Sequence, residues 1–336
     1  MTVKNVLICG GTGFIGHNLV LRFASQPKKY RVTATYLNSN IFEHENVTWV
    51  KADLREKDEV DALLRNADIV FQAAATTSGA SDIVNSPEIH VTDNAIMNSQ
   101  ILRSISRNKI SNFIFFSCTT MYSTSSTPQA EDEFDANIEV FPSYFGVAWT
   151  KFYIEKMCEF YSKICDTKFS VIRHSNIYGP WDKFDLKRSH VMGATITKVL
   201  EASEEVEVWG KGIELRDLLY VEDLVDLVEL VTEKQTSKFE LFNAGLGTGI
   251  SIKDLVGKVI KISGKNLRIV YNESKPNLAF SFVSNNSKVE RLFGWRAAVT
   301  LEEGIKRTID WQKENSPPLV LGENVQQFQK ETKDYA

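Results

Sequence analysis

A glycine-rich turn near the start of the chain constrains the fold more than any other feature. Val6, Leu7 and Ile8 form a short apolar run typical of a buried strand, and from Phe14 the apolar residues recur with helical spacing. Gly10, Gly13 and Gly16 lie at this junction. The first glycine permits a tight turn, the second lets the backbone approach a pyrophosphate, and the third lets the helix pack on the strand. The turn therefore predicts a dinucleotide-binding site, with free N–H groups of the helix facing the phosphates.

The chain then continues to alternate between strands and helices. Strands are predicted over residues 31–36, 47–50, 68–75, 113–116 and 169–173, and helices over residues 88–108 and 144–164. Such alternation requires a parallel sheet with helices on both faces. We expect an α/β fold of the Rossmann type, a doubly wound parallel sheet. At 336 residues the chain has room for a smaller carboxyl-terminal α/β domain as well.

The composition excludes several classes of protein. A net charge of −4 argues against nucleic-acid binding as the main function. The four cysteines lack metal-ligand spacing, so we expect reduced thiols and no metal site. The first predicted strand leaves no room for a signal peptide after Met1, and no apolar run reaches membrane-spanning length. We expect a cytoplasmic protein with neither a nucleic acid nor a membrane as partner.

The end of the second predicted strand bears on the choice of cofactor. At this point a carboxylate typically binds the ribose 2′-OH of NAD, whereas an arginine accommodates the 2′-phosphate of NADP. The side chains here are instead neutral: Tyr36, Leu37, Asn38 and Ser39. Because a 2′-phosphate would find no nearby cation, the sequence favours NAD over NADP.

Other candidate cofactor contacts follow the next two strands. Asp53, next to Leu54, is placed to accept a hydrogen bond from the adenine amino group; alternatively it caps the next helix. The strand over residues 68–75 ends in three alanines, which would let the backbone lie close to a cofactor or simply pack closely. The candidates up to this point are Gly10, Gly13, Phe14, Ile15, Gly16, Asp53, Leu54, Ala73, Ala74 and Ala75.

Polar side chains also follow the predicted strand over residues 113–116. Cys118, Thr119 and Thr120 stand at its carboxyl end. Ligands of open parallel sheets bind at the carboxyl ends of the strands, so these side chains are candidates for contact with a substrate.

Several separated motifs resemble the extended short-chain dehydrogenases that act on nucleotide-activated sugars. They are residues 10–16, 52–54, 176–180 and 216–223. Within that family, residues 189–191, Lys198 and residues 206–212 are most similar to GDP-fucose synthase and related GDP-sugar enzymes. Residues 146–151 also resemble GDP-sugar 4-dehydrogenases of capsular heptose pathways.

The resemblance implies a domain organisation. A cofactor domain would span residues 1–175, with residues 218–247 returning to it, and residues 176–217 and 248–315 would bind the nucleotide-sugar. Residues 316–336 would be a polar tail. The family also implies a homodimer or higher homo-oligomer, paired through two helices of each subunit.

Substrate-binding roles are likewise implied by the resemblance. The residues concerned are Asn176, His190, Val191, Lys198, Val208, Trp209, Arg216 and Lys275. A guanidinium suits a diphosphate because it offers two N–H groups in one plane. For Arg216 the alternative is a surface ion pair with Asp217 or Asp223.

The catalytic pattern of the family is altered in this chain. The resemblance implies a tyrosine four residues before a lysine, and here Lys151 is preceded at that distance by Val147. Lys151 would still hold the nicotinamide ribose. Cys118 occupies the position of the helper hydroxyl, and His190 that of an acid used in epimerisation. Tyr144, Thr119, Thr120, Cys118 and water all stay open as the proton acceptor.

Three functions compete. The leading one is an NAD-dependent oxidoreductase that acts at C4 of a GDP-linked hexose or heptose in the synthesis of capsule or lipopolysaccharide precursors. The second is a GDP-4-keto-sugar epimerase that uses His190 and Cys118. The third is a catalytically silent protein that binds cofactor and nucleotide-sugar.

Overall fold

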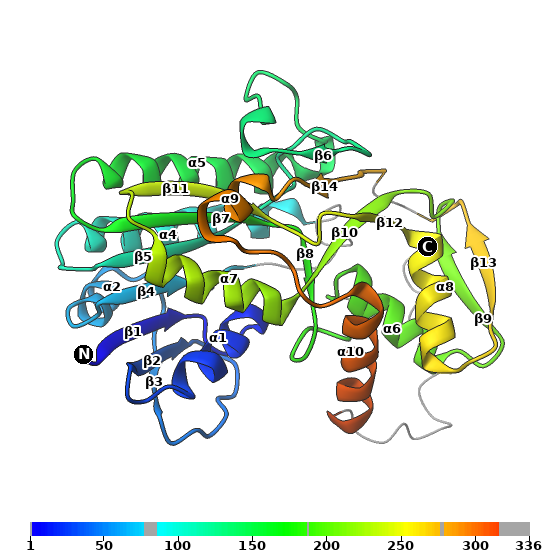
Figure 1. The fold of residues 1–336 in the computed structure, drawn as a ribbon, viewed down its shortest axis with the longest axis horizontal. Coiled ribbons are helices and arrows are strands. Elements are labelled where there is room, and N and C mark those ends of the chain that lie inside the picture. The colour runs from blue at the N-terminus through cyan, green and yellow to red at the C-terminus, as the bar shows by residue number, and fades with distance from the viewer. Residues whose placement is uncertain (1, 77–85, 187, 276–278, 316–336) are drawn as a thin grey trace.

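A seven-stranded parallel sheet forms the larger part of the molecule (Figure 1). The computed structural model describes residues 2–76, 86–186, 188–275 and 279–315. The strand order is β11-β7-β5-β4-β1-β2-β3. The strands are β1 (Lys4–Cys9), β2 (Tyr30–Tyr36), β3 (Val47–Lys51), β4 (Ile69–Gln72), β5 (Asn112–Cys118), β7 (Lys168–His174) and β11 (Phe239–Ala244). The order reverses between β1 and β4, which is where ligands of doubly wound sheets bind.

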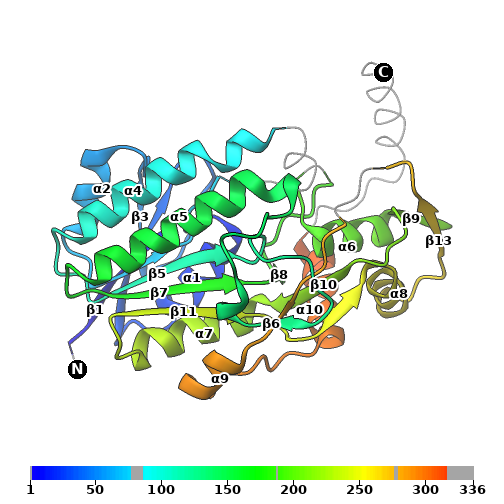
Figure 2. The same ribbon diagram turned by 90° about the horizontal axis from the view of Figure 1, so that it is seen from above.

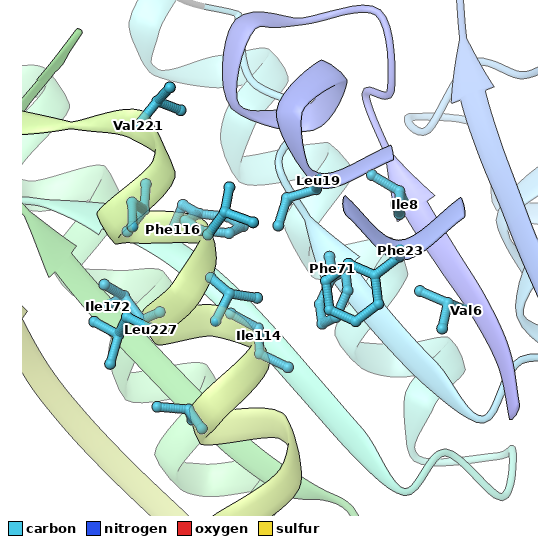
Figure 3. Close-up of a cluster of buried hydrophobic side chains, with 14 of the residues drawn as sticks. Val6, Ile8, Leu19, Phe23, Phe71, Ile114, Phe116, Ile172, Val221 and Leu227 are labelled. Carbon is cyan, nitrogen blue, oxygen red and sulfur yellow. The ribbon is translucent and has the colours of Figure 1, made fainter. Parts of the chain in front are cut away.

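Helices cover both faces of this sheet. One face carries α1 (Phe14–Ala24), α7 (Val221–Lys234) and α9 (Ser287–Phe293), and the other carries α2 (Lys57–Leu64), α4 (Thr92–Ile105) and α5 (Phe145–Ser162). Alternate residues of each strand point to opposite faces. On β5, Ile114 and Phe116 pack toward α1 and α7 (Figure 3), whereas Phe113 and Phe115 pack toward α4 and α5.

A smaller part of the molecule lies beyond the carboxyl ends of these strands, as Figures 1 and 2 show. Its strands are β8 (Asn176–Tyr178), β9 (Glu205–Trp209), β10 (Leu215–Tyr220), β12 (Gly249–Ser251) and β13 (Arg268–Asn272). Its helices are α6 (Val191–Glu201), α8 (Ile252–Ser263) and α10 (Leu301–Asn315), which share one apolar core. A short pair, β6 (Pro128–Gln129) with β14 (Val283–Ser284), completes the strands of the described residues.

The predicted Rossmann-type sheet is confirmed, with differences in two elements. The predicted helix over residues 88–108 is divided into a short 3-10 turn, η1 (Pro87–His90), and α4, because the backbone at Val91 (φ −108°) departs from helical geometry. The predicted strand over residues 68–75 ends at Gln72, before the three alanines. The residue boundaries given above for the domains stay predictions, and the tail lies outside the described residues.

Several elements were given no bounds in the sequence prediction, helix α2 and strand β10 among them. Helix α2 is eight residues long and buries only Val60 and Leu64, so its apolar period repeats too few times to be recognised in the sequence. Strand β10 carries Arg216 and Asp217 in its first half, which hides the strand pattern. Asp217 is nevertheless buried there, because its carboxylate accepts backbone N–H bonds from Leu246, Gly247 and Ser284.

Candidate active site

The glycine turn forms a cradle at the amino terminus of α1. Gly10 has φ +75° and contacts Ala74 so closely that a Cβ there would lie 2.6 Å from the Ala74 Cα. A Cβ on Gly16 would lie 2.1 Å from the Gly10 carbonyl oxygen, so the helix packs directly on the turn. Gly13, by contrast, has only one atom near its missing Cβ. The first turn of α1 carries no acidic side chain, so its N–H groups fit a pyrophosphate.

The other predicted cofactor residues surround this cradle on the sheet edge. Phe14 and Ile15 pack partly on the core cluster that α1 covers, and Leu54 is buried on the opposite face. Ala73 is half-buried, whereas Ala75 is exposed. Close packing therefore explains Ala74, which contacts Gly10, and leaves Ala75 accessible.

Asp53 has a partner that the sequence pattern did not indicate. Its two carboxylate oxygens bind the Arg55 guanidinium, with Arg55 Nη2 2.6 Å from Oδ2, and this hydrogen bond lowers the pKa of Asp53. Arg55 also binds Asp93 at 3.0 Å. The capping alternative is wrong, because Glu56 is the residue that precedes the first turn of α2.

The predicted polar residues at the end of β5 lie together. The Cys118 thiol lies 3.0 Å from the Thr120 hydroxyl, and Thr119 is buried. All four cysteines have free thiols, as predicted. Cys118 is one of the two that are only partly buried, since it stands at the carboxyl edge of the sheet.

Lys151 reaches this edge from α5. Its ammonium donates a hydrogen bond to the Phe116 carbonyl oxygen at 2.8 Å and lies 4.7 Å from the centre of the Phe115 ring. Burial lowers the pKa of Lys151, and the nearby Cys118 and Glu155 oppose that shift. The structure thus brings Lys151 and Cys118 together, as predicted residues of one site.

Tyr144 comes from the 3-10 turn η3 (Pro142–Tyr144) that precedes α5. It is 8% exposed. Burial raises its pKa, and the charge of Arg216 opposes this rise only in part. Val147 packs in the same apolar cluster as Tyr144. The predicted site therefore includes a tyrosine near Cys118 and Arg216, although it is not the one that the family pattern places before the lysine.

Arg216 is held by backbone carbonyls. Its Nη1 donates to the Leu215 oxygen at 3.0 Å and also to the Phe280 oxygen. No ion pair joins it to Asp217 or Asp223, whose carboxylates accept backbone N–H bonds instead. The ion-pair alternative is therefore wrong for these two partners.

His190 precedes α6 and faces the same region. It keeps part of its surface open to solvent, yet the surrounding protein lowers its pKa, chiefly by desolvation and then through the charges of Lys183 and His90. His174, at the end of β7, is affected by the charges of both Lys151 and His190. This histidine was not among the predicted site residues. The signal that would have found it is its position at the carboxyl end of a strand, directly beside Cys118 in register.

A second group of predicted residues lies on α6 and β9. The ammonium of Lys198 is 5.0 Å from the Trp209 ring centre, and that of Lys275 is 5.9 Å from it. Trp209 is 39% exposed and donates to Glu207 at 2.8 Å. Val208 points the other way into the core, so only its backbone is available to a ligand.

The remaining predicted substrate residues, Asn176 and Val191, already have partners within the protein. Asn176 donates from its Nδ2 to the Asp217 carbonyl oxygen at 3.1 Å. Val191 begins α6 and packs partly on the core of the smaller part of the molecule. Both side chains therefore already make contacts within the protein.

A buried ion pair lies behind the site. Arg173 on β7 binds Glu155 on α5 through Nη2, 2.7 Å from Oε2, and Ser117 donates to the same carboxylate at 2.6 Å. Glu155 stands one helical turn after Lys151, and Ser117 directly precedes Cys118. One carboxylate thereby joins the two elements that present the site.

Two kinds of feature are absent from the described residues. No group of histidine, cysteine and acidic side chains there has the arrangement of a metal site. Nor does any helix among them combine the length and apolar character needed to cross a membrane.

Two known proteins with similar sequences are named as GDP-sugar synthases. The chain is 26% identical over 314 residues to GDP-L-colitose synthase of Yersinia pseudotuberculosis, covering 91% of this chain and 97% of that protein. It is 27% identical over 313 residues to GDP-L-fucose synthase of Sinorhizobium fredii, covering 91% and 95%.

The fold is likewise found among solved structures. UDP-glucose 4-epimerase of Thermotoga maritima, solved with UDP-glucose, superimposes with a TM-score of 0.82 at 25% identity, covering 92% of this chain and 99% of that one. Residues 6–245 match the model of the NAD dependent epimerase/dehydratase family. With the glycine cradle, the parallel sheet and the polar edge in place, the chain belongs to the NAD dependent epimerase/dehydratase family.

Proposed function

We propose that this chain is an NAD-dependent oxidoreductase that acts at C4 of a GDP-linked hexose or heptose. The observation that carries the proposal is the position of Lys151, whose ammonium lies 2.8 Å from the Phe116 carbonyl oxygen of β5, close to Cys118. The family to which the chain belongs is NAD dependent. The two GDP-sugar synthases that match more than nine-tenths of the chain support the substrate class. We place the reaction in the cytoplasm, in the synthesis of polysaccharide precursors.

NAD is the proposed cofactor. When bound, it supplies the nicotinamide ring that exchanges a hydride with the sugar carbon. The cradle around Gly13 would hold its pyrophosphate, and Lys151 would hold its nicotinamide ribose. Arg55 is already paired with Asp53 and Asp93, so it offers a 2′-phosphate little unshared charge, which favours NAD over NADP. The Asp53 carboxylate would accept a hydrogen bond from the adenine amino group in exchange for one of its contacts with Arg55.

Proton transfer has no tyrosine at the position implied by the family, because Val147 stands there and cannot carry a proton. Cys118, Thr119, Thr120 and Tyr144 remain the proposed candidates. The Cys118 thiol and Thr120 hydroxyl already contact each other at the strand end, so they would bind the reacting oxygen as a pair. His190, across the site, would act as an acid in any epimerisation.

The nucleotide would bind against α6 and β9. Trp209 offers a partly exposed indole ring flanked by the ammonium groups of Lys198 and Lys275, a combination that suits a base and its diphosphate. Arg216 would complete the phosphate contacts. Asn176, Val191 and the backbone of Val208 would line the path between this group and the sheet edge.

We further propose a homodimer formed through α4 and α5. These helices lie side by side along one face of the sheet (Figure 2). They expose large apolar side chains, including Ile96 (41%), Tyr153 (53%) and Phe160 (55%). Light scattering after size exclusion should give twice the chain mass, and the double variant Tyr153→Glu, Phe160→Glu should give the monomer. A monomeric unmodified protein would contradict this assembly.

The activity is tested by mass spectrometry. Purified protein is incubated with GDP-manno-sugars and NAD, and separately with their 4-keto forms and NADH, beside the matching UDP-sugars. The proposal expects a change of two mass units in a GDP-sugar only. Lys151→Met should abolish it, whereas Lys306→Met, which removes an exposed ammonium paired with Asp310, should not.

The same reactions separate the alternatives. If no GDP-sugar changes mass, the oxidoreductase proposal fails. Deuterium taken up from solvent without net redox change would indicate the epimerase. Thermal stabilisation by NAD and GDP-sugar with neither altered after long incubation would indicate the silent binding protein.

A further inference from the structure

The hydroxyl of Tyr144 has no hydrogen-bond partner among the described residues. The side chain is 8% exposed, so more than nine-tenths of it is buried. A buried phenol usually finds a partner, because a hydroxyl that leaves water without one costs free energy. Its oxygen is not sealed from solvent, in contrast to the Oδ2 atom of Asp182. A small molecule in the site can therefore supply the missing hydrogen bond.

Two aromatic rings fix the direction of the Tyr144 side chain. The Phe280 ring stands edge-on to the phenol, with 5.2 Å between the ring centres and 90° between the planes. The centre of the Phe141 ring lies 5.7 Å away. Tyr144 ends the 3-10 turn that begins with Pro142, and the proline ring restricts the backbone there. The phenol is thus held in place before any ligand binds.

Phe280 also brings a positive charge to the phenol. Its carbonyl oxygen accepts a hydrogen bond from Arg216 Nη1, while its ring packs on Tyr144. Burial raises the pKa of Tyr144, and the charge of Arg216 opposes this rise only in part, so the phenol is protonated at neutral pH. When the phenol gives up its proton, the same guanidinium stabilises the phenolate.

Cys118 is a second neighbour of the phenol. It packs against the apolar cluster that contains Tyr144, and it acts on both Tyr144 and Lys151 through its charge. Under the proposed function, Cys118 and Thr120 bind the reacting oxygen of the sugar, and Arg216 binds the phosphates. A phenol near both Cys118 and Arg216 faces the sugar that lies between them.

The phenol comes from one helical turn before the position that the family pattern implies. Val147 follows Tyr144 by three residues and Lys151 follows it by seven. Seven residues of helix span about 10 Å along the axis, so the lysine lies two turns away from the phenol. The Lys151 ammonium instead binds the Phe116 carbonyl oxygen. Arg216 therefore takes the place of the lysine as the cation beside the phenol.

We infer that Tyr144 is the catalytic acid and base of the proposed oxidoreductase, with its hydroxyl at the oxygen on C4 of the sugar. The assignment rests on the proposed function, because it needs a sugar that is oxidised or reduced at C4. In reduction the C4 carbon gains a hydride from NADH, the Tyr144 O–H bond breaks, and that proton forms the C4 hydroxyl. The phenolate is paired with Arg216 and regains a proton from water. Oxidation reverses these steps.

The first test measures binding to the full chain by calorimetry. The probes are GDP-mannose and a GDP-linked manno-heptose, each beside its 4-deoxy analogue and beside GDP. One hydrogen bond is worth about five- to tenfold in affinity. Tyr144→Phe should weaken the sugars that carry the C4 hydroxyl by that factor and leave the 4-deoxy analogues and GDP unchanged. Tyr271→Phe, which removes a hydroxyl from a 44% exposed side chain of β13, should change none of them.

The second test measures turnover and stability of the same variants. Tyr144→Phe should lower kcat by about 100- to 10,000-fold, the usual contribution of a positioned acid or base, while Tyr271→Phe keeps the unmodified rate. The midpoint of urea unfolding should not fall in Tyr144→Phe, because the hydroxyl bonds no described residue.

Each other result counts against the assignment. An equal loss of GDP and GDP-sugar affinity would place the hydroxyl at the phosphates, and an unchanged kcat would show that it transfers no proton. A lower unfolding midpoint with parallel losses of all ligands would indicate a structural role. If the unmodified protein turns over a GDP-sugar and Tyr144→Phe changes nothing, the assignment fails while the proposed function stands. If the unmodified protein changes the mass of no GDP-sugar, both fail.

Discussion

Asp182 has a carboxyl group buried in the loop that follows β8. One oxygen accepts the Lys183 N–H at 2.7 Å, and the other is buried with no hydrogen-bond partner among the described residues. Burial raises the pKa of Asp182 from 3.8 to about 7. Since the folded state holds this proton more tightly than the unfolded state, the stability it confers is complete below about pH 4 and is lost as the pH rises through 7.

This predicts that Asp182→Asn makes the stability of the protein less sensitive to a rise from pH 4 to pH 8. The single group should cost the native protein about 4 kcal/mol between pH 4 and pH 8, and the variant should lack that loss. Urea unfolding at several pH values measures it. Parallel pH profiles for both proteins would mean that the carboxyl titrates normally.

At the scale of elements, the junction of β1 with α1 depends on Gly16. We predict that Gly16→Ala lowers the free energy of unfolding by about 1–3 kcal/mol and abolishes dinucleotide binding, because its Cβ would lie 2.1 Å from the Gly10 carbonyl oxygen. Gly257→Ala is the matched control, since nothing lies within 4 Å of its Cβ position in α8. There alanine should be neutral or stabilising by about 0.5–1 kcal/mol. Equal effects of the two substitutions would contradict the packing argument.

Helix α5 is joined to the sheet by the Glu155–Arg173 pair, both partners of which are buried. We predict that Glu155→Leu lowers the free energy of unfolding by about 3–5 kcal/mol, because it leaves the guanidinium buried without its counter-charge. The double variant Glu155→Leu, Arg173→Met should recover much of that loss. Urea unfolding of the single and double variants checks this, and additive losses would argue against coupling.

At the scale of the whole molecule, aromatic stacking joins the two parts. The His17 ring of α1 lies 3.9 Å from the Phe42 ring on one side and 3.9 Å from the Trp181 ring on the other. The centre of the Trp181 ring in turn lies 5.0 Å from the centre of the Trp311 ring of α10. Asn18 adds a hydrogen bond to the Pro180 carbonyl oxygen at 3.1 Å. The loop after β8 is therefore fixed between α1 and α10.

Acid should weaken this connection. Burial lowers the pKa of His17 from 6.5 to about 4, so the unfolded state binds the proton more readily, and stability present above pH 6.5 is lost as the pH falls toward 4. The loss should be about 3 kcal/mol at pH 4. His17→Phe keeps a stacking ring and should remove this part of the acid sensitivity in urea unfolding. An unchanged acid slope in the variant would contradict the prediction. Asp182 acts in the opposite direction, so each residue is tested in the background of the other's substitution.

The sequence by itself determined the order of strands and helices, the parallel sheet and the cradle at Gly10 to Gly16. Those features depend on local rules, namely the apolar period of each segment and the backbone freedom of glycine, which a linear pattern records. The bounds of helix α2 were not predicted because its eight residues hold too few repeats of the apolar period.

Only the tertiary structure decided the state of the site. The pairing of Asp53 with Arg55, the register of His174 with Cys118, and the carboxylate of Glu155 shared by Ser117 and Arg173 each join groups whose contact the sequence pattern did not indicate. Hydrogen bonding, burial and charge act through space, so the protonation and the free lone pair of a side chain are fixed only when its neighbours are in place.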